Sequence, residues 1–197
     1  MKAYTKGNKR VRIGHDDGAC NNPREWDNLG TIVTWHHRYN LGDERPRESV
    51  EEWRERITEW EEGDTETAEE KFNRLFVWLP VYLYDHGGIT INTTGFSCPW
   101  DSGQIGFIYV SREKLEREKM TEEHAREYMN GEIETYDKYL RGDVYYFVEE
   151  EYDEETGEWV EVDSCGGFYG DEWETNGMAD HCPLLRDESG VWFEEEG

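Results

Sequence analysis

The sequence has no long apolar run, and this absence argues against a membrane protein. A run of about 18 apolar residues, the length that indicates a membrane-spanning helix, occurs nowhere among the 197 residues. The first residues, MKAYTKGNKRVRIGHDD, also lack the apolar stretch of a secretory signal. We therefore expect a soluble intracellular protein with free thiols and no membrane partner.

Cysteine is also scarce, and its positions match no known zinc motif. Cys20, Cys98, Cys165 and Cys182 have 77, 66 and 16 residues between them, unlike the paired spacing of zinc fingers and ribbons. The glycine-rich stretches contain neither a GxGxxG nor a Walker pattern, so the sequence indicates no nucleotide-binding loop. We expect no cofactor.

Basic residues are few, and they are unevenly distributed. The formal net charge is −26. Residues 48–197 contain 12 Lys and Arg against 41 Asp and Glu, and residues 149–197 contain one base against 18 acids. Such a field repels nucleic acid and anionic membranes and attracts basic surfaces. Two interpretations are open: a solvated surface suited to high salt, or an acidic face that imitates nucleic-acid phosphates.

Hydrophobic residues make up only 35% of the chain, but aromatic residues make up 14%. Because each ring buries a large area, a small aromatic core can offset the chain entropy that folding removes. We expect one acidic domain over residues 1–197. Its class is predicted to be α+β, with a mostly antiparallel sheet and three or four helices.

Strands are predicted where β-branched and aromatic runs lie between turn residues. These runs are at 10–14, 31–39, 81–84, 89–93, 104–110, 144–152, 158–165 and 191–193. The last two runs before the C-terminal tail, 144–152 and 158–165, flank the turn sequence DEETG and so predict a hairpin.

Helices are predicted where apolar residues recur at helical spacing. They are at 50–62, from 65–67 to the residue before Pro80, at 111–118 and at 122–141. Ser49 and Glu52 form a capping-box pattern for the first helix. The last helix has an apolar stripe of Ala125, Tyr128, Met129, Ile133, Tyr136 and Leu140. Gly131 lowers the stability of this helix by about 1 kcal/mol relative to Ala.

The stretch 84–110 contains the side chains that would suit a cysteine hydrolase. Such an enzyme needs a thiolate, a base that generates it and a group that orients the base. Cys98, His86 and Asp101 supply these types, and backbone groups at Gly103 and Gly106 could form an oxyanion hole. The simpler interpretation is a small buried Cys and a His held in a turn. We expect a protein that is not an enzyme.

The histidines also raise the alternative of a metal site. His36 and His37 lie on a predicted strand, where neighbouring side chains point to opposite faces and cannot easily share one ion. One of them could join Cys165 across a sheet, and His181 with Cys182 offers another cluster. The interpretation that we favour places one His of the pair in the core and the other in solvent.

The acidic segments are the best candidates for a partner-binding surface. On the predicted helix 50–62, the candidates at helical spacing are Glu51, Glu55 and Glu59. On the predicted hairpin, they are Glu149, Glu150, Glu151 and Asp153. Spaced carboxylates can follow a groove that is built for phosphates. The alternative is a solvated face, which the charge pattern alone does not distinguish.

Three segments carry a resemblance to known proteins. They are DNLGTIVTWHHRYNLGD at 27–43, HGGITINTTGFSCPWDSGQIGFIYVS at 86–111 and VDSCGGFYGD at 162–171, and the likeness extends over about residues 10–180. Through them the chain resembles a family of uncharacterised proteins carried by phages and other mobile elements. The resemblance implies a viral or mobile-element accessory protein that acts in the cytoplasm of a host cell.

These features together predict an acidic accessory protein that binds a host or viral protein and does not bind nucleic acid itself. In its sharpest form, the hypothesis is an anti-defence inhibitor that imitates DNA. Its partner would be a basic, nucleic-acid-handling protein such as a host defence nuclease. The alternatives are a hydrolase that uses Cys98 and His86, and a metal-stabilised structural protein of a virion.

Overall fold

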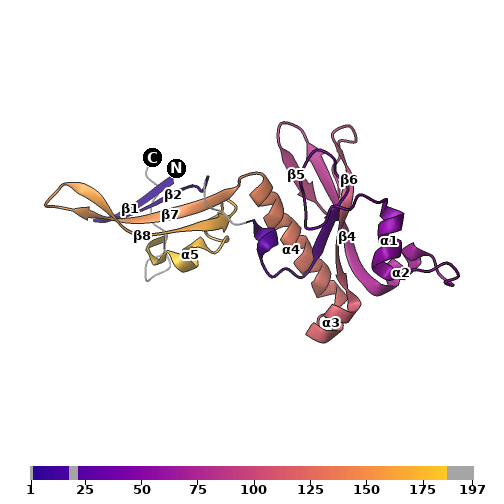
Figure 1. Ribbon diagram of the computed structural model, residues 1–197. Coiled ribbons are helices and arrows are strands. Elements are labelled where there is room, and N and C mark those ends of the chain that lie inside the picture. Colours follow the sequence, from indigo (N-terminus) through magenta and orange to yellow (C-terminus); the bar gives the residue numbers. More distant parts are fainter. Residues whose placement is uncertain (1, 18–21, 186–197) are drawn as a thin grey trace. The chain divides into compact units, whose positions relative to one another are not determined.

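A computed structural model describes residues 2–17 and 22–185, which form two compact units. Unit 1 combines the N-terminal residues up to Asn22 with the chain from Lys138 onward, and unit 2 is Pro23–Asp137. The α+β class is confirmed, and the strands pair antiparallel as expected. They form two sheets rather than one, with one sheet in each unit (Figure 1). The predicted strand at 191–193 and Cys20 lie outside the described residues.

Unit 2 is built around a four-stranded sheet with helices on both faces. The strand order is β3 (Thr31–Thr34), β6 (Ser102–Ser111), β4 (Phe76–Asp85) and β5 (Ile89–Asn92). One face is covered by α4 (Glu122–Leu140), and the other by α1 (Val50–Thr58) and α2 (Ala68–Leu75) (Figure 1). The short helix α3 (Arg112–Glu118) follows β6 directly.

The core between the sheet and α1 and α2 is almost entirely aromatic. Trp53, Phe72, Phe107 and Tyr109 are all buried there, and the Trp53 ring lies 5.5 Å from Phe72 and 5.4 Å from Tyr109. Glu44 accepts hydrogen bonds from Trp53 Nε1 at 3.4 Å and Tyr109 Oη at 3.1 Å. Burial raises the pKa of Tyr109. The large rings therefore supply buried apolar area that the low hydrophobic content of the chain would otherwise leave small.

The second helix ends earlier than the sequence pattern indicated. Helix α2 stops at Leu75, and Phe76 begins β4 in an extended conformation. Pro80 lies inside this strand, at a position that pairs with β6 only, because the pairing with β5 begins at Tyr82. A proline is tolerated there because the N–H that it lacks would face the edge of β4 that has no paired strand at this position.

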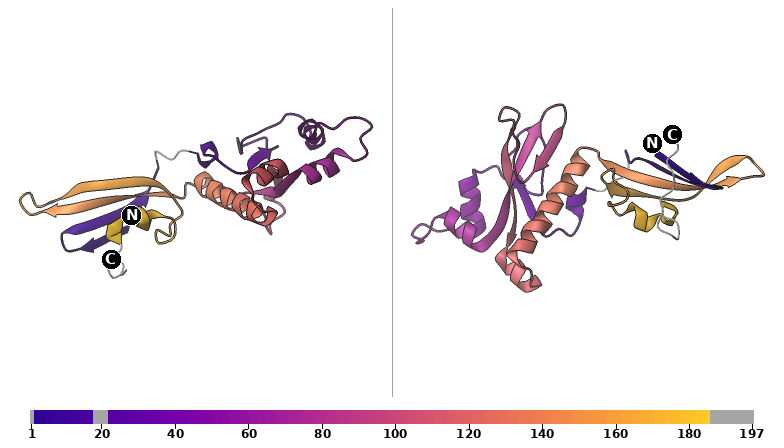
Figure 2. Two further views of the ribbon diagram at one scale, coloured as in Figure 1. Left: turned by 90° about the horizontal axis from the view of Figure 1, so that it is seen from below. Right: turned by 180° about the vertical axis from the view of Figure 1, so that it is seen from behind.

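Unit 1 contains the second four-stranded sheet. Its order is β1 (Lys2–Lys6), β2 (Lys9–His15), β7 (Val144–Asp153) and β8 (Glu158–Tyr169). One face packs against α5 (Met178–His181) and the 3-10 turn η2 (Pro183–Leu185), and α5 lies below the sheet in Figure 1 and in the right-hand view of Figure 2. Phe147, Trp173 and Leu185 are buried between them. Neither β1 nor α5 was predicted from the sequence.

Local sequence signals explain where the helices begin. The Ser49–Glu52 capping box is confirmed at the start of α1, and Thr67 with Glu70 forms a second box at α2. In each box the hydroxyl and the glutamate satisfy backbone N–H groups that the first turn leaves unpaired. None of the helices that the structure describes is long and apolar enough to cross a membrane.

Candidate functional site

The three residues of the predicted catalytic group lie together at one end of the unit 2 sheet. His86 follows β4, and Cys98 and Asp101 lie in the loop before β6. The carboxylate of Asp101 is the centre of the group: its Oδ2 lies 3.3 Å from His86 Nδ1 and 3.7 Å from Cys98 Sγ. The sequence therefore indicated correctly that these three side chains lie close together.

Their order differs from that of a catalytic triad. A nucleophilic cysteine needs the histidine between the thiol and the carboxylate, so that the ring can take the proton. Here Asp101 lies between the other two: the Cys98 thiol donates to its carboxylate, and the His86 ring lies against the same oxygen. The expected oxyanion hole is also not formed, because Gly103 and Gly106 pair with β4 within the ladder of β6. This geometry favours a structural hydrogen-bonded cluster over a hydrolase site.

His36 and His37 follow β3 in a turn and do not lie on a strand. His36 stacks on Tyr39 at 5.2 Å, and its Nδ1 accepts the Tyr39 N–H at 3.2 Å. Burial lowers the pKa of His36. Asp85 joins the turn to the sheet, since its Oδ2 lies 3.0 Å from both Arg38 Nη1 and Tyr39 Oη. The sequence did not predict the contacts of Asp85 with Arg38 and Tyr39, because these partners lie 47 and 46 residues away in the chain.

A hollow of about 420 Å³ lies beside this turn. It is lined by His36, Arg38, Asp85 and Asp101, with Trp100 at the rim. Trp100 is 92% exposed, which is unusual for so large a ring, and aromatic residues of this kind are common at protein interfaces. Of these charges, Arg38 and Asp85 pair with each other, whereas Asp101 lies against His86 and Cys98.

The alternative metal site does not form among the described residues. His36 and His37 belong to unit 2, whereas Cys165, His181 and Cys182 belong to unit 1. Cys165 is exposed, and Cys182 is fully buried in the unit 1 core, where burial and the neighbouring Glu149 raise the pKa of its thiol. No group of three potential ligands occurs within residues 2–17 and 22–185.

The three predicted carboxylates of α1 form a row that the fold leaves unused. Glu51, Glu55 and Glu59 recur every fourth residue, so they share one side of the helix. Glu51 and Glu59 are exposed and Glu55 is partly exposed. Among the described residues, none of the three side chains makes an ion pair or hydrogen bond. We call these three residues the α1 row.

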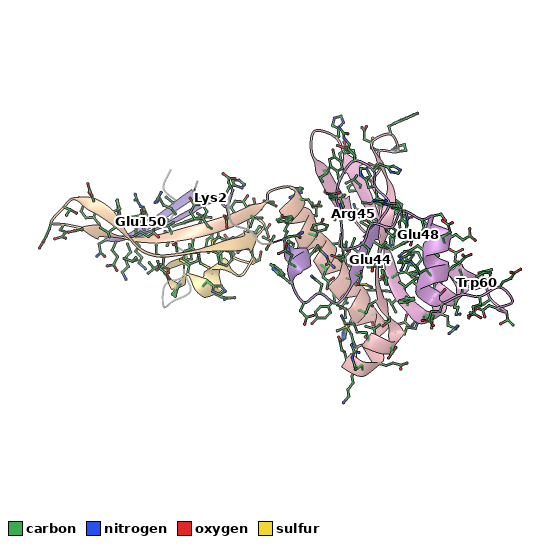
Figure 3. All side chains as sticks on the ribbon, viewed as in Figure 1. Lys2, Glu44, Arg45, Glu48, Trp60 and Glu150 are labelled. Carbon is green, nitrogen blue, oxygen red and sulfur yellow. The ribbon has the colours of Figure 1, made fainter. Side chains whose placement is uncertain are left out.

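Most of the other acids around the α1 row are engaged within the fold; Glu61 and Glu62, which follow it, are exposed. Glu52 and Glu70 belong to the two capping boxes. Ion pairs join Glu48 to Arg56, Asp64 to Lys71, Glu66 to Arg74 and Glu69 to Arg54. Figure 3 marks Glu48 before α1 and Trp60 after it. The α1 row therefore differs from these paired and capping acids in having no structural partner among the described residues.

The spacing and the C-terminal end of the α1 row suit a helix poorly, although Glu51 lies in the first turn, where the helix dipole favours an acid. Like charges four residues apart destabilise a helix by about 0.2–0.5 kcal/mol per pair. Glu59 is the C-cap in the left-handed conformation, with φ 51°, where a side chain is strained and a negative charge opposes the helix dipole. Helix α3 has the same left-handed cap, but there the residue is Lys119, whose charge the dipole favours.

The hairpin acids are a correction to the predicted binding surface. Glu150 is only 5% exposed, and its carboxylate accepts from Arg10 Nε at 2.7 Å and from Arg12 Nη2 at 2.8 Å (Figure 3). Glu151 pairs with Lys9 at 3.2 Å. One Glu149 oxygen is buried, beside Cys182. Glu150 cannot face a partner because Arg10 and Arg12 of β2 surround it, and Glu149 is partly buried, whereas the side chain of Glu151 stays 46% exposed beside Lys9.

Asp153 has a local role as well. Its Oδ1 accepts the backbone N–H groups of Glu155 at 2.8 Å and Thr156 at 3.4 Å, which holds the β7–β8 turn. These bonds lower the pKa of Asp153. The exposed acids of the hairpin are instead Glu154, Glu155, Glu158, Glu161 and Asp163. The sequence identified an acidic hairpin but could not separate its paired acids from its solvated ones.

Comparisons with protein-family models, with curated proteins and with solved structures find no match. Function is therefore inferred from the geometry and charge of the chain itself.

Proposed function

We propose that the protein binds a basic protein partner through the α1 row. In the form that we favour, the partner handles nucleic acid, and the carboxylates occupy positions that phosphates would otherwise take. The protein would then be an inhibitory accessory protein of a phage or mobile element, acting on a host defence nuclease or a similar enzyme.

The observation that carries the proposal is the contrast between the α1 row and most of the acids around it. These acids cap helices or pair with bases, whereas in the described part of the chain Glu51, Glu55 and Glu59 have no such role, and the exposed Glu61 and Glu62 continue the unpaired charge beyond the helix. Two of them lie where an acid lowers helix stability. Residues that lower the stability of the fold and make no structural contact are typical of functional surfaces.

The spacing limits how much of a nucleic acid the row can imitate. Successive carboxylates lie about 6 Å apart along the helix axis, whereas one DNA strand carries a charge about every 3.4 Å. The row thus has roughly half the charge density of a strand over a short distance. It suits contact with a few basic side chains and not with a whole DNA-binding groove.

Capture from a host-cell lysate tests the proposal. We expect the wild-type chain to retain a basic, nucleic-acid-handling protein, and the triple variant Glu51→Gln, Glu55→Gln, Glu59→Gln to lose most of it. Retention should weaken as salt rises, because exposed charge contacts are screened. Added duplex DNA should displace the chain from the partner if both use the same basic surface.

The matched control removes the same charge elsewhere. The variant Glu154→Gln, Glu155→Gln, Glu158→Gln changes three exposed acids in and beside the β7–β8 turn and should capture as the wild type does. Equal capture by the α1 triple variant would reject the row as the binding surface. Recovery of no basic or nucleic-acid-handling protein by the wild type would reject the proposed function itself.

A further inference from the structure

A second, separate surface lies on the opposite face of the unit 2 sheet. A groove of about 480 Å³ runs between α4 and the turn around η1 (Pro23–Glu25), a size within the usual range of ligand sites. Its lining is mostly apolar, and two aromatic rings contribute to it: Trp26 is 51% exposed and Tyr128 is 61% exposed. The apolar stripe predicted for the last helix included Tyr128, but the structure exposes it.

The wall that carries Trp26 is held rigid by its own hydrogen bonds. Asn28 Nδ2 donates to the carbonyl oxygens of Pro23 at 2.9 Å and Trp26 at 3.0 Å. The Asn28 N–H also donates to Trp26 O at 3.0 Å. A groove whose wall is ordered before binding loses less conformational entropy when a ligand enters.

An ion-pair network centred on the buried Arg24 side chain joins this wall to α4. The Arg24 side chain is 4% exposed and donates to Asp43 Oδ2 at 2.7 Å, Glu132 Oε2 at 3.1 Å and Gly30 O at 2.6 Å. Glu132 also accepts the Leu29 N–H at 2.6 Å. Burial alone would lower the pKa of Arg24, but the bonds to Asp43 and Glu132 outweigh it and raise that pKa. The network therefore fixes the width of the groove.

Gly131 is the residue that folding does not explain. It lies inside α4 and lines the groove, and a glycine within a helix is less stable than alanine. Its φ is not positive, and a Cβ added there would meet no atom within 4 Å. Neither the backbone nor the packing requires glycine. Because Gly131 has no side chain, it leaves space in the groove.

The charge of the surroundings indicates what fills that space. Helix α4 contains six acids against two bases, Arg126 and Lys138, and Glu127 lies on the groove beside Tyr128. Aromatic faces attract cations within about 6 Å of the ring, and a neighbouring carboxylate adds to this attraction. An apolar groove with an acidic rim suits a long cationic side chain, whose methylene stem packs while its head stays near the charge.

We propose that this groove binds a lysine or arginine side chain from an extended basic segment of a partner protein. The Trp26 and Tyr128 rings and Glu127 would contact the cation, and Gly131 would leave room for its stem. The proposal does not depend on the α1 row, which lies across the sheet. An experiment that rejects binding at one of the two surfaces leaves the proposal for the other unchanged.

Titration of the full chain with a short blocked glycine–serine peptide that has a central arginine tests the groove. The α1 row is first neutralised by Glu51→Gln, Glu55→Gln and Glu59→Gln, so that it cannot contribute. We expect the NMR signals of the Trp26 indole and of Tyr128 and Gly131 to shift on binding. The same peptide with citrulline, which has no charge, should bind at least about tenfold more weakly.

Gly131→Leu fills the groove without changing the charge and should weaken binding of the arginine peptide at least about tenfold. Leucine is a strong helix former, so α4 should remain folded. Gly131→Ala should keep the binding and raise the thermal midpoint, and Tyr128→Ala, an exposed change, should weaken binding. Undiminished binding by Gly131→Leu, equal affinity for the citrulline peptide, or signal shifts confined to other regions would overturn the proposal.

Discussion

Two glutamates of this acidic chain have different roles, and the difference depends on whether other residues of the fold pair with the side chain. Glu150 is buried between Arg10 and Arg12, whereas Glu59 is exposed and makes no ion pair. Burial alone would raise the pKa of Glu150, but hydrogen bonds from Arg12 and Arg10 outweigh it and hold that pKa below the ordinary value of 4.5. Glu150 therefore stabilises the fold of unit 1.

Replacing Glu150 with Gln should lower the free energy of unfolding at neutral pH by about 2 kcal/mol, because two arginines lose a charged hydrogen-bond partner. Since the folded pKa is depressed, this stabilisation is present above the ordinary pKa and is lost as pH falls through the folded one. The difference between wild type and variant should thus shrink below pH 4.5. Denaturant unfolding across this range measures it.

The exposed Glu158→Gln variant is the control for this experiment and should change stability little, as surface substitutions usually do. A difference between wild type and Glu150→Gln that stayed constant with pH would contradict an ionised, paired Glu150. An increase in stability in Glu150→Gln at neutral pH would contradict its structural role altogether.

At the scale of elements, the ends of the helices separate structural signals from functional ones. The capping boxes at Ser49 and Thr67 agree with general helix chemistry. The left-handed C-caps differ: Lys119 ends α3 with a charge that the dipole favours, and Glu59 ends α1 with one that it disfavours. Helix α1 therefore retains a residue that stability alone would replace.

Glu59→Gly should raise the free energy of unfolding by about 1 kcal/mol, because glycine adopts the left-handed conformation without strain. The same change at Lys119 should give a smaller gain, since it relieves similar strain but removes a favourable charge. Thermal or denaturant unfolding of the two variants compares them directly. A loss of stability in Glu59→Gly would show that Glu59 has a structural contact and would weaken the case for the α1 row.

At the scale of the whole molecule, the net charge of −26 opposes compaction. Even if each of the 21 bases were paired with an acid, 26 of the 47 acids would keep an unbalanced charge. Added salt screens this repulsion over the Debye length, which falls from about 10 Å at 0.1 M to about 3 Å at 1 M.

We expect the thermal midpoint to rise as NaCl increases from roughly 0.02 M to 0.5 M, because screening removes more repulsion than it costs in exposed ion pairs. Differential scanning calorimetry measures the change. A plateau at higher concentration would fit simple screening. A further steady rise in molar KCl would favour the solvated, high-salt interpretation of the surface. A fall in the midpoint over the first interval would contradict net repulsion.

How far the sequence predicts the fold varies from one element to the next. Helix α1 follows from its capping box and its apolar spacing, and β7 and β8 follow from their turn. The boundary between α2 and β4 does not, because Phe76 and Leu79 continue the helical pattern although pairing with β6 extends them. The strand β1 was missed because its two lysines and single buried residue, Tyr4, give it almost no apolar signal.

The candidate site divides in the same way. The sequence predicts that His86, Cys98 and Asp101 are near each other, since they fall within one short stretch of the chain, but not that Asp101 lies in the middle. It predicts the α1 row because four-residue spacing fixes a side of a helix. The groove beside Gly131 was missed, although an isolated glycine in a helical pattern was the signal that could have pointed to it.

The sequence by itself determined the class of the fold, the acidic field and the spacing of the α1 row, because each depends on composition or on neighbours a few residues apart. Only the tertiary structure decided which acids are free. Glu150 meets Arg10 across 140 residues, and that pairing exists only once β2 and β7 lie side by side. Exposure and pairing depend on such distant contacts, which no local pattern contains.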